Sequence, residues 1–219
     1  EFLAKQEEFL RRKALLAVYR DRETVDAEGN RYALYSNIGS PAEAGAAAEA
    51  GAEGIGLFRT EFLFMDRNSV PTETEQYEAY LAVSRIMAGK EVIIRTLDVG
   101  GDKAGEYLGM AHEDNPFLGH RAIRYCLDNP DLYKVQLRAL LRAGAEEKNI
   151  KIMLPLVTSL EEIRGARALL ETCKAELEAE GLPYHKDIPL GIMVETPAAA
   201  LIADLLAREC DFFSIGTND

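Results

Sequence analysis

Short runs of apolar residues recur along the chain and alternate with longer segments in which apolar residues return every three or four positions. A run that is apolar at nearly every position is typical of a strand buried on both faces, as in a parallel sheet covered by helices. The pattern therefore predicts an α/β fold in which strand and helix alternate six times. The predicted strands are residues 32–36, 54–58, 91–97, 149–157, 190–194 and 212–215.

The segments between these strands carry helix signals. Ser40 can cap an alanine-rich helix, with Pro41 at the first helical position and Glu43 completing a capping box. The polar residues 21–31 and the apolar stretch 62–65 are predicted as loops. The other predicted helices are residues 1–20, 72–88, 121–126, 131–147, 159–180 and 197–209.

Two architectures have this alternation, an open doubly wound sheet and a (β/α)8 barrel. The first predicted strand is not followed by the GxGxxG pattern of dinucleotide-binding sheets. Polar or charged residues end the second, third, fifth and sixth strands, as expected when all strand ends face one common mouth. The barrel is therefore favoured, although a barrel needs eight strands and the chain supplies six.

The strand ends supply the candidate chemistry. The segment GIMVETP (191–197) is a buried strand that ends in Glu195, and Arg59, Arg95 and the pair Asn218–Asp219 end three other strands. Because parallel strands end on the same rim, these side chains can converge although they are far apart in the sequence.

Two guanidinium groups offer paired donors to a phosphate or carboxylate. A Glu and an Asp on nearby strands can share Mg²⁺, which takes one or two protein carboxylates together with substrate oxygens. The rim residues therefore predict a site for a metal-bound phosphorylated anion. The alternative is two salt bridges on the rim, Arg59 with one acid and Arg95 with the other.

Composition narrows the function classes. The net charge of -12 and the pI of about 4.8 argue against general nucleic-acid binding, so an anion site must depend on a few placed arginines. The three cysteines are scattered without metal-ligand spacing, and no apolar run reaches membrane-spanning length. We therefore expect a cytoplasmic protein without a disulfide framework.

Six motifs occur in one order and together resemble the C-terminal domain of enzyme I of the sugar phosphotransferase system, the phosphoenolpyruvate-protein phosphotransferase. The resemblance covers essentially the whole chain. Pyruvate phosphate dikinase and phosphoenolpyruvate synthase share fewer of these motifs. The motifs are GLFRTEFLFMDR (56–67), IIRTLDVGGDK (93–103), NPFLGHRAIR (115–124), IMLPLV (152–157), GIMVETPAAA (191–200) and DFFSIGTND (211–219).

This resemblance implies a phosphoenolpyruvate site on a (β/α)8 barrel. By motif match, Arg59 and Arg95 would hold the phosphoryl group, and Glu195 and Asp219 would ligate Mg²⁺. Asn218, beside Asp219, would contact the phosphate and carboxylate end of the substrate. Arg121, in the LGHRAIR segment, would be a further contact.

The resemblance also implies an arrangement in a longer protein. Residues 1–22 would be a linker helix from an upstream phosphohistidine domain, and residues 23–219 a partial barrel. The phosphoryl group would pass to the upstream histidine and then to the phosphocarrier protein HPr for sugar uptake, in a homodimer. The proton-donating cysteine and a further substrate arginine of the family lie beyond the sixth strand, so no catalytic residue is assigned in these residues. The alternatives are a related PEP-utilising enzyme of the pyruvate phosphate dikinase or phosphoenolpyruvate synthase type, a catalytically incomplete dimerisation fragment, and a barrel lyase or kinase that acts on pyruvate-like acids.

Six strands of a barrel leave two open parallel edges, which are prone to aggregation. We therefore expect the molecule either to be longer than these 219 residues or to have its gap filled by another chain. The intact mass in solution tests this expectation. A monodisperse monomer of 24.2 kDa would contradict it.

Overall fold

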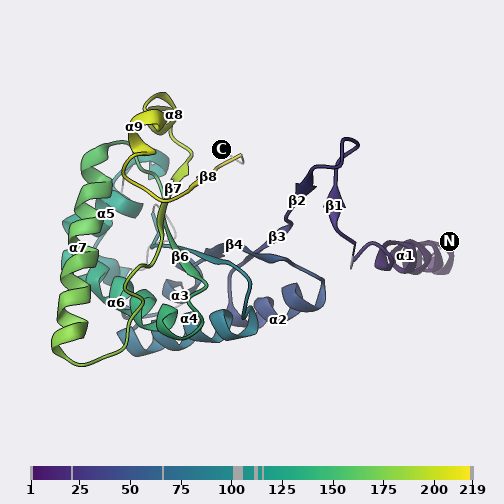
Figure 1. Cartoon of the computed structure of the whole chain (residues 1–219), viewed down its shortest axis with the longest axis horizontal. Helices are drawn as coiled ribbons and strands as arrows, with labels where there is room; N and C mark the ends of the chain where they lie inside the picture. The colour runs from purple at the N-terminus through teal and green to yellow at the C-terminus, as the bar shows by residue number, and fades with distance from the viewer. Residues whose placement is uncertain are drawn as a thin grey trace.

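A computed structural model describes residues 2–20, 22–65, 67–100, 106–110, 113–114 and 116–217. Its centre is a six-stranded parallel sheet with helices packed on the outer face (Figure 1). The elements are α1 (Phe2–Ala17), β1 (Thr24–Val25), β2 (Arg31–Tyr32), β3 (Tyr35–Ile38), α2 (Pro41–Glu49), β4 (Gly54–Arg59), α3 (Glu61–Phe64), α4 (Glu73–Ile86), β5 (Val92–Arg95), η2 (Glu106–Leu108), η3 (Pro116–Leu118), α5 (Ala122–Asp128), α6 (Pro130–Glu147), β6 (Ile150–Leu154), α7 (Leu160–Ala179), β7 (Leu190–Val194), α8 (Pro197–Leu201), α9 (Ala203–Leu206) and β8 (Phe213–Ile215).

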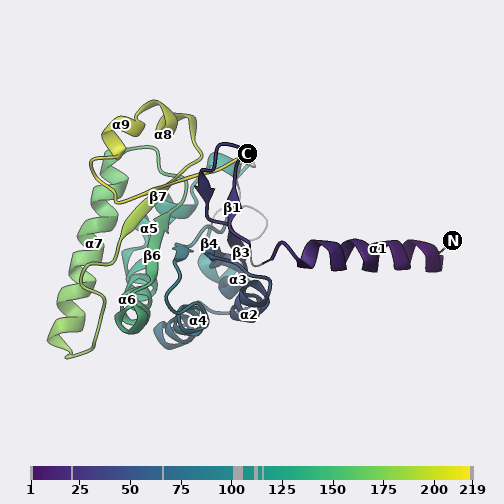
Figure 2. The same cartoon turned by 45° about the vertical axis from the view of Figure 1, so that its right-hand side comes forward.

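The strand order decides between the two architectures. The sheet runs β3-β4-β5-β6-β7-β8, so each strand pairs in parallel with the next strand of the chain. In a doubly wound sheet the strand order reverses at a switch point, and the order of these six strands contains no such reversal. The curled sheet is therefore a partial (β/α)8 barrel that holds six of the eight strands (Figure 2).

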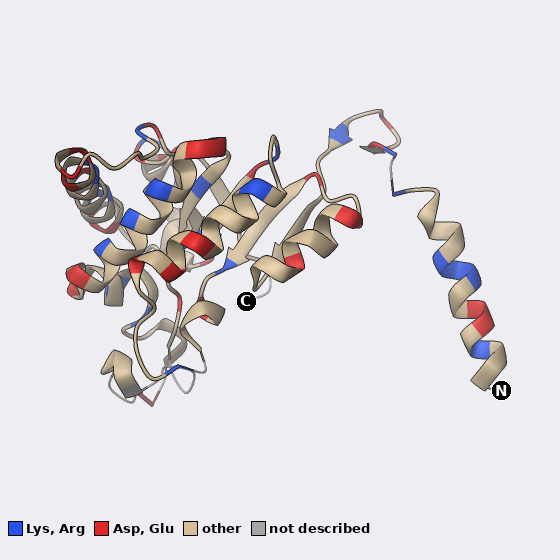
Figure 3. Cartoon of the chain, turned by 90° about the horizontal axis from the view of Figure 1, so that it is seen from below, with Lys and Arg blue, Asp and Glu red and all other residues tan. Residues whose placement is uncertain are grey.

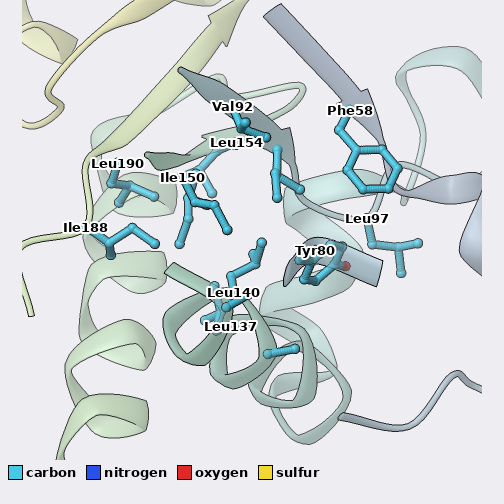
Figure 4. Packing of buried hydrophobic residues seen from close by; sticks show 14 of the residues in the cluster. Phe58, Tyr80, Val92, Leu97, Leu137, Leu140, Ile150, Leu154, Ile188 and Leu190 are labelled. Carbon is cyan, nitrogen blue, oxygen red and sulfur yellow. The ribbon is translucent and has the colours of Figure 1, made fainter. Parts of the chain in front are cut away.

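The main core lies between the outer face of the sheet and the helices. Ile150, Ile152 and Leu154 alternate along β6 and are fully buried, and Leu137 and Leu140 of α6 lie against the sheet (Figure 4). Each fully buried side chain of this kind contributes about 1.5–3 kcal/mol relative to an exposed one. This layer fixes the strands and thereby the rim on which they end.

Most predicted elements are confirmed, but the first sheet strand is shifted. The prediction of 32–36 is wrong at its start, because Arg31–Tyr32 pairs with Thr24–Val25 in a small antiparallel ribbon. The carboxylate of Asp26 accepts hydrogen bonds from the backbone N–H groups of Glu28 and Asn30 at 2.9 Å and holds the turn of that ribbon. Strand β3 begins only at Tyr35.

Three local expectations need correction. The capping box at α2 is incomplete: the Ser40 hydroxyl donates to Glu43 at 3.0 Å and accepts no bond from the helix. The predicted loop at 62–65 begins with the short helix α3. The single helix predicted for 197–209 divides into α8 and α9, because Ile202 adopts φ -112 and ψ 21, outside the helical range.

Helix α1 projects away from the barrel in both views (Figures 1 and 2), and none of its residues is buried.

Acidic and basic segments are intermixed on α1 and on the helices that cover the sheet (Figure 3). None of the described helices combines the length and the apolar character that a membrane crossing requires.

The concave face of the sheet is built differently from its outer face. Glycines lie beneath two aromatic rings there, because a Cβ on Gly191 would meet the Phe212 ring at 2.5 Å and a Cβ on Gly54 would meet the Tyr35 ring at 2.9 Å. The missing Cβ atoms of these glycines therefore make room for the two rings.

This packing predicts a difference between two glycine-to-alanine substitutions. In Gly54→Ala the new Cβ would also lie 2.9 Å from the Glu91 carbonyl oxygen, so we expect a loss of about 1–3 kcal/mol in the free energy of unfolding. Gly45→Ala, in α2 with no atom within 4 Å of the new Cβ, should gain about 0.5–1 kcal/mol. Urea denaturation measures both, and equal midpoints would contradict this account.

Candidate functional site

Arg59 and Arg95 are the last residues of β4 and β5, and they are direct partners in the ladder between these strands. Partners in neighbouring parallel strands point to the same face of the sheet. The two guanidinium groups predicted from the sequence to converge are therefore adjacent at the carboxyl end of the sheet.

The Arg59 side chain lies against an aromatic ring, with its Cζ 4.9 Å from the centroid of Phe62. Its Nε is buried and has no hydrogen-bond partner among the residues that the structure describes. A buried donor without a partner is costly, and here it belongs to a side chain that lines a cavity.

Arg95 is held by two carboxylates. Its Nη2 lies 2.8 Å from Glu61 Oε1 and its Nη1 lies 3.0 Å from Asp98 Oδ2, with only 11% of the side chain exposed. Burial and two charged partners fix the orientation of the guanidinium before any ligand arrives. The Arg95 Nε and Glu61 Oε2 are also buried and unpaired within the described residues.

Arg121 shares one of these carboxylates. Both its Nε, at 3.0 Å, and its Nη2, at 2.7 Å, donate to Asp98 Oδ1. Asp98 is 6% exposed and thus bridges the two arginines, Arg95 and Arg121. Arg121, the further contact implied by the resemblance, therefore belongs to the same cluster as Arg95.

Glu195 follows directly after β7 and lies on the same rim. Its Oε1 accepts a hydrogen bond of 2.7 Å from the backbone N–H of Leu156. The chain after β8 also passes beside it, since a Cβ on Gly216 would meet the Glu195 Cβ at 2.7 Å. The predicted partners Asn218 and Asp219 lie outside the described residues.

Backbone strain accompanies two of these side chains. Among the described residues other than glycine, only Ala122, Lys148 and Leu156 have a positive φ. Ala122 follows Arg121, and Leu156 is the donor to Glu195. A positive φ at such residues costs about 1–2 kcal/mol each, and strain of this kind concentrates where a structure orients functional groups.

These side chains border a cavity of about 1100 Å³. Its volume slightly exceeds the usual range for small-molecule sites, which is about 300–1,000 Å³. Apolar residues from the loops complete the wall. The lining residues are Arg59, Glu61, Phe62, Met65, Arg95, Asp98, Gly100, Glu113, Asp114, Pro116, Phe117, Leu118, Arg121, Leu156, Glu195 and Pro197.

The structure bears on the alternative in which the rim arginines only form salt bridges. Arg95 forms ion pairs with Glu61 and Asp98, two acids that were not named from the sequence. Glu61 and Asp98 were missed, although each follows an Arg-Thr pair at a strand end by one or two residues. An Arg-Thr pair at a strand end, with an acidic residue one or two positions later, is the sequence signal that could have identified them.

The donor set can be compared with the needs of a metal ion. The described residues contain no group of three or more His, Cys, Asp or Glu side chains placed to hold one. Mg²⁺ needs only one or two protein carboxylates when substrate oxygens complete its shell. Glu195, at the cavity wall, is a suitable donor of this kind, and the sequence supplies Asp219 a few residues beyond Gly216.

The bridging role of Asp98 predicts a large stability effect. In Asp98→Ala two partly buried guanidinium groups lose their shared anion, which should cost about 3–5 kcal/mol of unfolding free energy. Arg85 makes the same two-nitrogen contact with Glu146, whose side chain is 50% exposed. Glu146→Ala should therefore cost only about 0–1 kcal/mol. Chemical denaturation compares the two, and similar losses would refute the burial argument.

Comparison with known proteins agrees with this geometry. Residues 13–219 match the family described as PEP-utilising enzyme, PEP-binding domain. The phosphoenolpyruvate-protein phosphotransferase of Staphylococcus carnosus is 53% identical over 219 residues, which are 100% of this chain and 38% of that protein. The proteins of the same name from Staphylococcus aureus and Priestia megaterium are 51% and 49% identical over 215 residues, or 98% of this chain and 37% of each relative. The chain thus spans a little over a third of these curated relatives, and it belongs to the family of PEP-binding domains of PEP-utilising enzymes.

Proposed function

We propose that the cavity at the carboxyl end of the sheet binds phosphoenolpyruvate and that Arg59 and Arg95 hold its phosphoryl group. The observation that carries this proposal is the pair of adjacent strand-end arginines whose buried Nε atoms have no partner among the described residues. Arginine donors in a fixed geometry match the oxygens of a phosphate. The name of the Staphylococcus carnosus relative contains the same compound.

The charge of the cavity wall supports a role for a cation. Its three arginines stand against five carboxylates, so the wall alone would repel a phosphorylated carboxylate. We infer that Glu195 and Asp219 would hold Mg²⁺. When bound, the ion would neutralise charge on the phosphate oxygens.

The arginines then have a defined task. Phosphoryl transfer passes through a loose transition state whose charge is spread over the phosphate oxygens, so catalysis depends on positioning and charge stabilisation. Glu61 and Asp98 hold Arg95 in place in advance, which avoids reorganisation when the charge develops. Asn218 and Arg121 would contact the remaining oxygens of the substrate.

The relatives are named for transfer to a protein. We propose that the first acceptor is a histidine in an upstream domain, that HPr receives the phosphoryl group next for sugar uptake, and that the protein acts as a cytoplasmic homodimer. The described cysteines are all free, as a reducing compartment requires. A dikinase or synthase of the same family is the second candidate, supported by the breadth of the matching family.

Titration with phosphoenolpyruvate tests the site. With Mg²⁺ present, Arg95→Ala and Arg59→Lys should bind about 10- to 100-fold more weakly than the unsubstituted protein, because each loses charge-assisted bonds worth about 1.5–3 kcal/mol. Arg85→Ala, on the outer face and paired with Glu146, is the matched control and should bind normally. Calorimetry with and without Mg²⁺ provides the measurement.

Binding that is independent of Mg²⁺ and indifferent to Arg59→Lys would count against this site. Arg59→Lys keeps the charge and disturbs no ion pair named above, so it separates recognition from misfolding. Phosphorylation of a histidine in the complete polypeptide would favour the phosphotransferase over the dimerisation fragment. Turnover of phosphoenolpyruvate without any phosphohistidine would favour the barrel lyase or kinase.

A further inference from the structure

A buried glutamine binds the chain just beyond the two arginines. Gln136 of α6 is 0% exposed, and its amide makes three hydrogen bonds. Its Oε1 accepts from the backbone N–H of Leu97 at 2.9 Å. Its Nε2 donates to Thr60 Oγ1 at 3.2 Å and to the Tyr80 hydroxyl at 3.1 Å. Both Nε2 hydrogens are therefore used, and the bond from Leu97 fixes which end of the amide carries oxygen.

These partners are placed where the two strands end. Thr60 follows Arg59 directly, and Leu97 lies two residues after Arg95. The paired ladder of β4 and β5 ends at the arginines themselves, so the chain beyond it needs other partners. The Thr60 hydroxyl donates to the Arg95 carbonyl at 2.8 Å, which closes the connection between the two strand exits.

The network behind Gln136 is rigid and neutral. Burial raises the pKa of the Tyr80 hydroxyl, which keeps its proton and donates to Gln76 Oε1 at 3.0 Å. Gln76 donates in turn to the Pro71 carbonyl at 3.0 Å. Tyr80 and Leu97, two of the groups that Gln136 binds, both belong to the packed core shown in Figure 4.

We propose that Gln136 is a positioning residue for the phosphoryl site: it ties the exits of β4 and β5 together and thereby fixes Arg59 and Arg95 relative to each other. The proposal rests on the proposed function for its catalytic consequence, but its structural core concerns only the two guanidinium groups. An error of about 1 Å in such groups can cost about 100-fold in rate.

Gln136→Met tests the proposal, because methionine has nearly the same volume and makes none of the three bonds. The matched control is Gln76→Met, another fully buried glutamine of the same network that does not bind either strand exit. Both variants lose buried hydrogen bonds, so both should be destabilised. Only Gln136→Met should change the arginine geometry.

The first measurement is the nitrogen-15 spectrum of the arginine Nε–H groups in the complete polypeptide that carries these residues. We expect the Arg59 and Arg95 signals to shift in Gln136→Met and to keep the positions of the unsubstituted protein in Gln76→Met. The second is the single-turnover rate of phosphoryl transfer from phosphoenolpyruvate, which should fall about 10- to 100-fold in Gln136→Met and less than about threefold in Gln76→Met.

Unshifted signals in Gln136→Met, or equal effects of both variants, would overturn the proposal. Gln136→Glu keeps an acceptor for Leu97 and has no Nε2 donor, so its effects on the arginine signals and on the rate should lie between those of Gln136→Met and Gln76→Met. This variant covers the case in which Gln136→Met fails to fold. Shifted arginine signals in a protein that does not use phosphoenolpyruvate would leave the positioning role intact and refute the proposed function.

Discussion

Two positive charges lie side by side where β4 and β5 end, and this constraint organises the rest of the site. Like charges at directly paired positions are destabilising, and burial makes their repulsion stronger. The structure compensates with Glu61 and Asp98 around Arg95 and with an aromatic ring beside Arg59. The two arginines still keep buried Nε donors without partners among the described residues, and both side chains line the cavity.

The architecture was largely predictable because it depends on apolar periodicity. The runs that became β4 to β8 were each recognisable, and the polar or charged residues at four strand ends favoured the barrel over the doubly wound sheet. Errors occurred where short-range polar contacts decide the structure. The Asp26 carboxylate holds the β1–β2 ribbon by accepting hydrogen bonds within its turn, and at the start of α2 the Glu43 carboxylate accepts a hydrogen bond from the Ser40 hydroxyl. Periodicity contains no information on such contacts.

Only those residues of the candidate site that end a strand could be placed from the strand pattern. Arg59, Arg95 and Glu195 could be placed because each ends a strand, and parallel strands end on one rim. Asp98 and Gln136 contact residues that are far from them in the sequence. Asp98 binds Arg121, 23 residues away along the chain, and Gln136 binds Thr60, 76 residues away. Nothing in a single sequence marks a buried glutamine on a helix as the partner of a strand end. The geometry of the folded chain is needed to reveal it.

The shared carboxylate of Asp98 has a mechanical consequence. Because one oxygen binds Arg121 and the other binds Arg95, a displacement of either guanidinium changes the force on its neighbour. Arg121 directly precedes α5, so the carboxylate links the end of β5 to the start of α5 through two separate oxygens. The positions of a strand end and a helix start that are far apart in the sequence therefore depend on each other at this one residue.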